Sequence, residues 1–387
     1  MNQTDKNQPE KVFKAEAKPV SNETKPEPKP DIKPEVKPET KPSDSKPPKI
    51  DLQIDKEAIK KLKLVVVAYS HVEREWFPTD EAYEAEVEVE GRAEQVLEKL
   101  TQLGIEAKGH PGNQYFLTNL LVDKPDVVIN LVDTLKGKDR LQTSVPAALE
   151  LSNIPYTGAG MEGLVIGNNR NLTKRLLLAY EIPTPSYQFI RRVGTTIQEE
   201  LGLPLIVKLN ESGGSVGIDN KAVKESFKDV QKKVDDMITT YRLPVVVERF
   251  VDGPEITVCV FDDGSKNHVF MAEKIFRKKP DGKHFFTSLE SYEDEKAYRY
   301  KVVEEPLRSK IEKLAVRAFN GLSHKDYAKF DIRVDESTNT PYFTDSNPNT
   351  AFGPDKGLPF TEVAALHDIK FDDILLSLLS KYAKEIK

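Results

Sequence analysis

Two aspartates and an asparagine in the last quarter of the sequence have the types and spacing of a divalent-metal site. Asp331 lies in the apolar run 329–335, and Asp345 and Asn347 follow a second apolar run that begins at Pro341. If the two runs form a hairpin, Asp331 lies opposite Asp345, with Asn347 just beyond. Two carboxylates at such a short distance repel each other unless a cation lies between them, and Mg²⁺ prefers hard oxygen ligands. We therefore favour a site in which this segment and nucleotide phosphates together bind Mg²⁺, with Mn²⁺ as an alternative ion. The alternative is a hairpin with a purely structural role.

A glycine-rich loop after a buried strand has the composition of a polyphosphate-binding loop. It reads Glu211-Ser-Gly-Gly-Ser-Val-Gly217, so consecutive backbone N–H groups can face one anion and Ser215 adds a hydroxyl donor. Taken alone, the loop is more typical of an ordinary turn. Lys208 points to an anion, because a lysine among the aliphatic residues of the preceding strand is costly without a negative partner. Lys174 is a second candidate, although by itself it is typical of a helix surface.

Two further acids bracket a turn at the end of another apolar strand. Glu248 ends the run that begins at Val245, and Glu255 follows the turn Asp252-Gly-Pro. Glu248 could accept a hydrogen bond from an adenine amino group, and Glu255 could accept from ribose hydroxyls. Two acids flanking a surface turn would look the same in the sequence.

Motifs of other enzyme classes are absent or misplaced. Gly158-Ala-Gly-Met-Glu-Gly163 matches the G-x-G-x-x-G string of dinucleotide-binding domains, but that motif should join the first strand of a domain to its helix. Here it follows Ile154-Pro-Tyr-Thr157, and proline favours a sharp connection over a buried parallel strand. We therefore predict a turn into a helix. The sequence has no Walker-type G-x-x-x-x-G-K-[ST] motif and no H-x-x-x-H pair, which disfavours a zinc hydrolase.

Composition restricts the partners and the compartment. The net charge of −6 over 387 residues excludes a broad basic surface and disfavours duplex nucleic acid as a partner. The single cysteine, Cys259, cannot form an internal disulfide, which fits a reducing compartment. No apolar run approaches the roughly 20 residues that span a bilayer. We expect a cytoplasmic protein without a membrane partner.

The N-terminal residues differ from the rest of the chain. The first fifty residues hold ten of the 26 prolines, and Lys-Pro recurs every fourth residue from Lys25 to Lys41. Proline removes backbone donors, and the few apolar side chains cannot offset the entropy of ordering. We predict a disordered Lys/Pro/Glu-rich tail over 1–58. A solvated spacer is the favoured interpretation, and a docking arm for a partner protein is the alternative.

The rest of the sequence predicts a fold with α/β and α+β parts in three units. Residues 61–155 alternate short apolar strands with helical stretches, which indicates an open parallel α/β domain. Residues 156–242 form a small second unit that carries the glycine-rich loop. In residues 243–387 strands cluster before helices, which indicates an antiparallel sheet with helical cover.

In order along the chain, five segments resemble the ATP-grasp enzymes, most closely their D-alanine–D-alanine ligase branch. They are IPYTG at 154–158, NLTK at 171–174, LIVKLNESGGSVGI at 205–218, VVVERFVDGPEITV at 245–258, and KFDIRVD with DSNPN at 329–335 and 345–349. The resemblance covers roughly 61–387. It implies an ATP-grasp fold of three subdomains, in which 61–155 is the substrate-side domain, 156–242 is the lid and 243–387 is the catalytic subdomain.

The resemblance also implies roles for individual residues. Those that it places around ATP are Lys174, Lys208, Ser215, Glu248, Arg249, Val251, Glu255 and Lys296. The two lysines and Ser215 would contact phosphates, Arg249 and Val251 would line the base, and Lys296 would reach the γ-phosphate when a mobile loop closes. The implied Mg²⁺ ligands are Asp331, Asp345 and Asn347. Lys329 stands where the family has an arginine that stabilises the oxyanion of the tetrahedral intermediate, and Ser215 is counted with it as catalytic.

Departures from the family pattern concentrate on substrate recognition. A Gly-Gly-x-Ser-x-Glu stretch of the family is replaced by the sequence 68–75, and a His-Gly-x-x-Gly-Glu segment by 133–139. Gly214 replaces a serine of the family's lid, and Asp345 replaces a metal-binding glutamate. Lys329 replaces an arginine, and a lysine keeps the positive charge but cannot form the two parallel hydrogen bonds of a guanidinium.

These observations predict an ATP- and Mg²⁺-dependent carboxylate–amine ligase for amino acids or peptides. It would form an acylphosphate, release ADP and act on small molecules other than the family's usual substrates. A homodimer and a protein that docks the tail are further partner hypotheses. The alternative function is an ATP-grasp module that binds nucleotide without turnover and recruits a partner through its tail.

Overall fold

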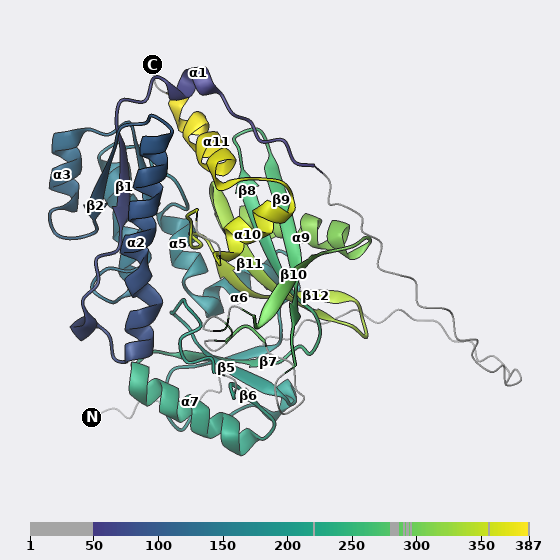
Figure 1. Ribbon diagram of the computed structural model, residues 1–387. Coiled ribbons are helices and arrows are strands. Elements are labelled where there is room, and N and C mark those ends of the chain that lie inside the picture. Colours follow the sequence, from purple (N-terminus) through teal and green to yellow (C-terminus); the bar gives the residue numbers. More distant parts are fainter. Residues whose placement is uncertain are drawn as a thin grey trace, which may run out of the picture.

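The computed structural model describes residues 49–219, 221–278, 286–288, 291, 294, 296–354 and 357–385. Within these residues the strands form three sheets with helices packed around them (Figure 1). Most of the predicted tail, residues 1–48, lies outside the described residues. No helix in the described part of the chain is both long enough and apolar enough to cross a membrane.

The N-terminal sheet is parallel, with the order β2-β1-β3. Its strands are β1 (Val65–Tyr69), β2 (Ala107–Pro111) and β3 (Val127–Leu131). Parallel neighbours need a crossover, which α2 (Asp80–Gln102) and α3 (Phe116–Asp123) provide. Helix α2 begins where Thr79 caps it by accepting a hydrogen bond from the Ala82 N–H. After η2 (Asp139–Thr143) and α4 (Ser144–Leu151), Tyr156 bridges Val128 in parallel. Pro155 thus lies beside the edge of the parallel sheet but in no strand, so its missing N–H is tolerated.

The lid sheet is antiparallel, with the order β4-β7-β5-β6, and lies at the bottom of Figure 1 with α7 beneath it. Its strands are β4 (Tyr187–Ile190), β5 (Leu205–Leu209), β6 (Val223–Lys224) and β7 (Val245–Arg249). Helix α7 (Phe227–Tyr241) packs Val230, Val234 and Met237 against the face of this sheet that carries Leu205, Val207 and Leu209. A short helix, η3 (Glu199–Leu201), precedes β5.

The C-terminal sheet is antiparallel, with the order β10-β9-β8-β11-β12. Its strands are β8 (Glu255–Asp262), β9 (Asn267–Phe276), β10 (Tyr298–Val302), β11 (Tyr327–Asp335) and β12 (Thr340–Asn347). Its helices are α9 (Leu307–Gly321), α10 (Pro359–Leu366) and α11 (Phe371–Ala383). The three architectures are those predicted: an open parallel unit, a small antiparallel unit and a larger antiparallel unit.

Two elements pair or pack with a different unit from the one in which the predicted boundaries place them. Strand β7 falls in the predicted unit 243–387 but pairs with β5 and β4 of the lid sheet. Helix α6 (Arg170–Ala179) falls in 156–242, yet Leu177 packs into the core of the C-terminal sheet. An apolar run looks the same whichever sheet it joins, so the sequence could not resolve this exchange.

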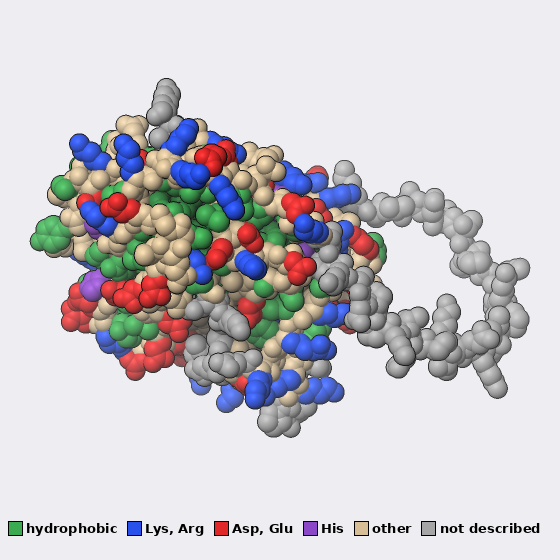
Figure 2. Space-filling view, turned by 45° about the horizontal axis from the view of Figure 1, so that its top comes forward, with side chains coloured by type: hydrophobic (Ala, Val, Ile, Leu, Met, Phe, Trp, Pro, Cys, Tyr) green, Lys and Arg blue, Asp and Glu red, His purple; other side chains and the backbone are tan. Residues whose placement is uncertain are grey.

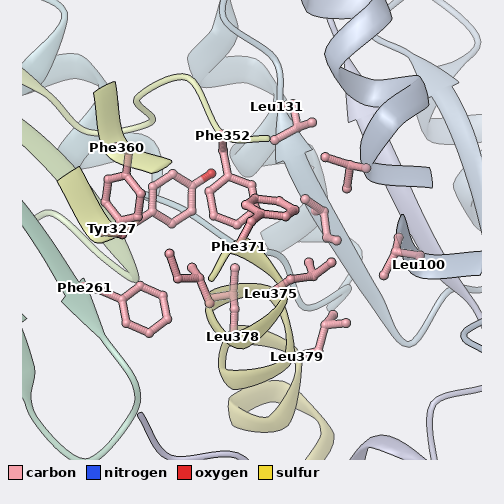
Figure 3. Close-up of a cluster of buried hydrophobic side chains, with 14 of the residues drawn as sticks. Leu100, Leu131, Phe261, Tyr327, Phe352, Phe360, Phe371, Leu375, Leu378 and Leu379 are labelled. Carbon is pink, nitrogen blue, oxygen red and sulfur yellow. The ribbon is translucent and has the colours of Figure 1, made fainter. Parts of the chain in front are cut away.

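Residues 49–58 are ordered, although the predicted tail included them. Ile50, Leu52 and Ile54 pack against a core shared by the N-terminal and C-terminal sheets, and α1 (Lys56–Ile59) follows. The Asp55 N–H donates to Ser380 Oγ of α11 at 2.8 Å. Figure 3 shows this core, where Leu100 and Leu131 of the N-terminal unit meet Phe352, Phe371 and Leu375. The alternation of apolar and polar residues from 50 to 54 is the signal that the compositional reading overlooked.

Gly158–Gly163 forms the predicted turn into a helix, α5 (Met161–Gly167). A Cβ on Gly163 would lie 2.3 Å from the backbone oxygen of Ser323, where α5 meets the C-terminal unit. We expect Gly163→Ala to lower the free energy of unfolding by about 1–3 kcal/mol through overpacking. Gly91→Ala is the matched control, because Gly91 lies within α2 with nothing near its Cβ position. It should raise stability by about 0.5–1 kcal/mol. Urea denaturation measures the free energy of unfolding of both variants. Equal stability of the two would contradict the close contact between Gly163 and the Ser323 backbone.

Candidate active site

One cavity, with about 790 Å³ of space between protein atoms and partly open to solvent, lies between the lid sheet and the C-terminal sheet. The predicted site residues that line it are Lys208, Ser215, Glu248, Arg249, Val251, Glu255, Lys329, Asp331, Asp345 and Asn347. Residues from 208 to 347 along the chain thus meet in one place. Figure 2 shows acidic and basic side chains interspersed over one face of the molecule, which suits the absence of a broad basic surface there.

The predicted carboxylate pair lies on β11 and β12. Asp331 is paired in register with Asp345, and Asn347 with Lys329, as the predicted hairpin requires. A β-bulge follows Asp331, and Asn347 Nδ2 lies 3.5 Å from Asp331 Oδ2. Asp331 Oδ1 is buried and has no hydrogen-bond partner within the described residues. A buried, unpartnered carboxylate oxygen beside a second carboxylate is suited to a hard cation.

Cationic side chains surround the two aspartates. Lys329 Nζ contacts Asp331 Oδ2, and Arg170 Nη2 lies 2.6 Å from Asp345 Oδ2. Burial raises the pKa of Asp345, but Arg170, Lys208 and Lys329 together outweigh it and hold that pKa below its usual value, so Asp345 stays ionised. The described residues contain no cluster of three or more His, Cys, Asp and Glu side chains. With the Asn347 amide oxygen as third donor, this set nevertheless fits Mg²⁺.

Glu248 lies between the two predicted phosphate lysines. Its carboxylate oxygens are each 3.3 Å from an ammonium nitrogen, Oε1 from Lys174 and Oε2 from Lys208. Lys174 lies behind Glu248 rather than on the cavity wall, and it donates to Thr184 Oγ1 at 2.9 Å. Burial lowers the pKa of Lys174 to about 8 despite Glu248. In this arrangement Glu248 neutralises both lysines, so its predicted contact with adenine stays a prediction.

Glu255 is held by residues that sequence reasoning missed. Lys274 Nζ and Arg333 Nη1 each lie 3.2 Å from its carboxylate, and Thr287 donates to it as well. Burial alone would raise the pKa of Glu255, but Lys274, Arg333 and Thr287 together lower it to about 2. Arg333 could have been found, because residues 329, 331 and 333 alternate onto one face of a strand. Lys274 comes from β9, and only the tertiary pairing of β8 with β9 brings it here.

An apolar wall closes the other end of the cavity. Ile206, Ile218 and Phe286 form a small buried cluster there, against which Phe250 packs. The Phe250 and Phe286 rings meet edge to face, and the Arg333 guanidinium lies 4.5 Å from the centre of the Phe250 ring. Such a surface suits a flat heteroaromatic ring. The backbone of Arg249 and Val251 runs past it, where the resemblance places the base.

The glycine loop (residues 212–217) contacts the N-terminal unit. The Gly213 N–H donates to Asp139 Oδ2 at 3.2 Å, and the Gly217 N–H donates to Glu81 Oε1 at 2.7 Å. A Cβ on Gly214 would lie 2.7 Å from the Cβ of Ala85 on α2, so the loop approaches that helix closely. Ser215 lines the cavity with a positive φ of 57°. Lys296, in contrast, is exposed and lies outside the cavity wall.

An antiparallel lid sheet and a larger antiparallel sheet that clasp such a cavity define the ATP-grasp class of proteins. The family model described as "D-ala D-ala ligase C-terminus" matches residues 176–380, more than half of the chain, and the protein belongs to this family.

Individual relatives agree with this assignment. A D-alanine–D-alanine ligase from Polaromonas sp. (strain JS666) is 26% identical over 295 residues, which cover 74% of this chain and 84% of the relative. A D-alanine–D-alanine ligase from Clostridium perfringens is 29% identical over 268 residues, which cover 68% and 84%. The crystal structure of a D-alanine–D-alanine ligase from Bacillus anthracis complexed with ATP superposes with a TM-score of 0.63 at 19% identity, over 84% of this chain and 99% of the other.

Family membership confirms the predicted class of activity. The protein is an ATP-dependent, ADP-forming carbon–nitrogen ligase that acts on small molecules, which favours turnover over the alternative of a binding module. The homodimer, the tail-docking partner and the cytoplasmic location stay predictions.

Proposed function

We propose that the protein joins a carboxylate to an amine through an acylphosphate, with Mg²⁺ bound by Asp331, Asp345 and Asn347. The observation that carries this proposal is the meeting of those three side chains with Lys208 and the glycine loop in one cavity. When bound, Mg²⁺ would supply charge neutralisation for the polyphosphate. The apolar wall formed by Ile206, Phe250 and Phe286 would hold adenine, with Glu255 near the ribose.

The proposed chemistry has two steps. A carboxylate oxygen of the first substrate attacks the γ-phosphorus of ATP, the bond to the β–γ bridging oxygen breaks, and ADP leaves. The amine nitrogen of the second substrate then attacks the acyl carbon, phosphate leaves, and the nitrogen loses a proton. Lys208 would orient the phosphates, and Lys329 would stabilise the oxyanion of the tetrahedral intermediate. The glycine loop would exclude water, which would otherwise hydrolyse the acylphosphate.

The substrates proposed here are amino acids or short peptides. D-alanine is the amino acid in the names of the relatives, but residues 68–75 and 133–139 depart from the family pattern where that substrate is recognised. Half-buried Asp133 and Asp139 in the second of these segments add negative charge beside the site. We therefore expect a substrate pair other than two D-alanines.

An ADP-release assay with pooled D- and L-amino acids and dipeptides tests the function. We expect ADP release that needs ATP, Mg²⁺ and at least one amine, with D-alanine alone giving a lower rate than the best pool. Chelation of the metal by EDTA should stop the reaction, and added Mg²⁺ or Mn²⁺ should restore it. ATP binding without ADP release on any pool would contradict the proposal.

A further inference from the structure

The segment between β7 and β8 (residues 250–254, the linker) passes directly from the lid sheet to the C-terminal sheet. At its lid end the Phe250 N–H donates to the Pro204 carbonyl at 2.9 Å. At its other end the Pro254 carbonyl accepts from the Val334 N–H of β11 at 2.9 Å. The first residues of the linker also line the cavity between the two sheets. The linker is therefore both a connection between the sheets and a part of the wall where we propose that adenine binds.

Arg333 of β11 holds the middle of the linker. Its Nε donates to the Val251 carbonyl at 2.7 Å, and its Nη2 donates to the Gly253 carbonyl at 3.1 Å. The same guanidinium lies 4.5 Å from the centre of the Phe250 ring and pairs with Glu255. Because a guanidinium presents its N–H groups in a rigid plane, these simultaneous contacts fix the linker against β11.

The Val251 N–H can read the edge of a base. Val251 is buried and lines the cavity, and its N–H has no acceptor among the residues that the structure describes. Its carbonyl, in contrast, accepts from Arg333. An N–H donates to N1 of adenine, which is an acceptor, whereas N1 of guanine carries a hydrogen and would face it donor to donor. A donor left unpaired in this way weakens binding, so the edge favours adenine.

The ion pair of Arg333 with Glu255 does not by itself account for this arrangement. Lys274 also pairs with Glu255, at 3.2 Å, and Thr287 donates to it, so the carboxylate has compensation without Arg333. A cation that only neutralised Glu255 would not need to span two linker carbonyls as well. Lys274 shares the carboxylate from another strand, β9, and is therefore the matched comparison for Arg333.

We propose that Arg333 is a positioning residue for nucleotide recognition. It fixes the linker so that the Val251 N–H meets N1 of adenine, and it thereby makes the site select adenine over guanine. Arg333 acts through the linker and not on the reacting atoms. This inference rests on the proposed position of the nucleotide and adds to it the residue that sets the choice of base.

Calorimetry on the full chain with ADP and with GDP, each with Mg²⁺, tests the inference without requiring turnover. We expect the wild type to bind ADP at least about tenfold more tightly than GDP. Arg333→Lys keeps the charge but cannot hold both carbonyls, so the ratio of the two affinities should fall by about tenfold through weaker ADP binding. Arg333→Gln should lose selectivity to the same extent. Lys274→Met is the matched control and should keep the wild-type ratio, because it removes a partner of Glu255 and leaves the contacts of Arg333 with the linker.

Three results would overturn the inference: equal binding of ADP and GDP by the wild type, Arg333 variants that keep the wild-type ratio, or an equal loss of the ratio in Lys274→Met. The last of these would assign the effect to the ion pairs of Glu255. Urea denaturation identifies the folded variants, and either Arg333 variant is enough to decide. No binding of ADP to the wild type would contradict the proposed nucleotide site itself, whereas ADP binding with an unchanged ratio contradicts only the role of Arg333.

Discussion

Asp331→Asn is expected to lower the rate of ADP release by about three orders of magnitude, and Lys208→Ala by a similar factor. Asp331 supplies a buried oxygen without a hydrogen-bond partner in the described chain, opposite Asp345 on the next strand. An amide removes the charge and half of the oxygen donors at that position, so a shared cation would lose its main ligand. Lys208 lies on the cavity wall, where we propose that it contacts the phosphates, and alanine there would leave Glu248 facing the polyphosphate.

The measurement is ADP release at saturating ATP and Mg²⁺ on the best substrate pool. Asp335→Asn is the matched control, because Asp335 ends the same strand outside the cavity and caps a turn through Ser337. It should retain the wild-type rate within about threefold. Wild-type activity in Asp331→Asn and Lys208→Ala together would refute the assignment of the site.

Glu255→Gln is expected to lower the free energy of unfolding at pH 7 by about 3 kcal/mol and to weaken ATP binding. The substitution leaves Lys274 and Arg333 buried without their shared carboxylate. The folded pKa of Glu255, about 2, lies below its ordinary value of 4.5. The group therefore contributes stability that is fully present above about pH 4.5 and is lost as the pH falls toward 2. By linkage this contribution is also about 3 kcal/mol.

Urea denaturation at pH 7 and at pH 3 measures this contribution. Glu255→Gln should be less stable than the wild type at pH 7, and the difference should shrink at pH 3. Glu200→Gln, an exposed acid on the lid unit, is the control and should match the wild type at both values. If the two variants behave alike, the buried ion pairs of Glu255 do not support the cavity.

The part of the site that the sequence predicted depends on local periodicity. Asp331 and Asp345 could be paired in advance because each lies in a short apolar run, and a hairpin aligns two such runs. Arg170, Lys274 and Arg333 neutralise the predicted acids from other elements, and charge alone does not say which acid a distant cation meets. Of these three, Arg333 lies on the same face of the strand as Asp331, so the alternation of residues along the strand could have predicted it as a site residue.

The fold shows the same division between local and distant information. Strand and helix types followed from apolar spacing, and the three architectures followed from their order along the chain. The assignment of β7 to the lid sheet and of α6 to the C-terminal core depends on pairing across the chain, which apolar spacing does not encode. Residues 49–58 pack on α11 because a few alternating apolar side chains suffice there, whatever the composition of the preceding residues.

The most direct test of the account is a crystal structure of the protein with a non-hydrolysable ATP analogue and Mg²⁺. We expect the adenine against Phe250 and Phe286, the phosphates at Lys208 and the glycine loop, and the metal among the oxygens of Asp331, Asp345 and Asn347. A nucleotide bound elsewhere, or a metal held by other side chains with these three turned away from it, would contradict the central claim.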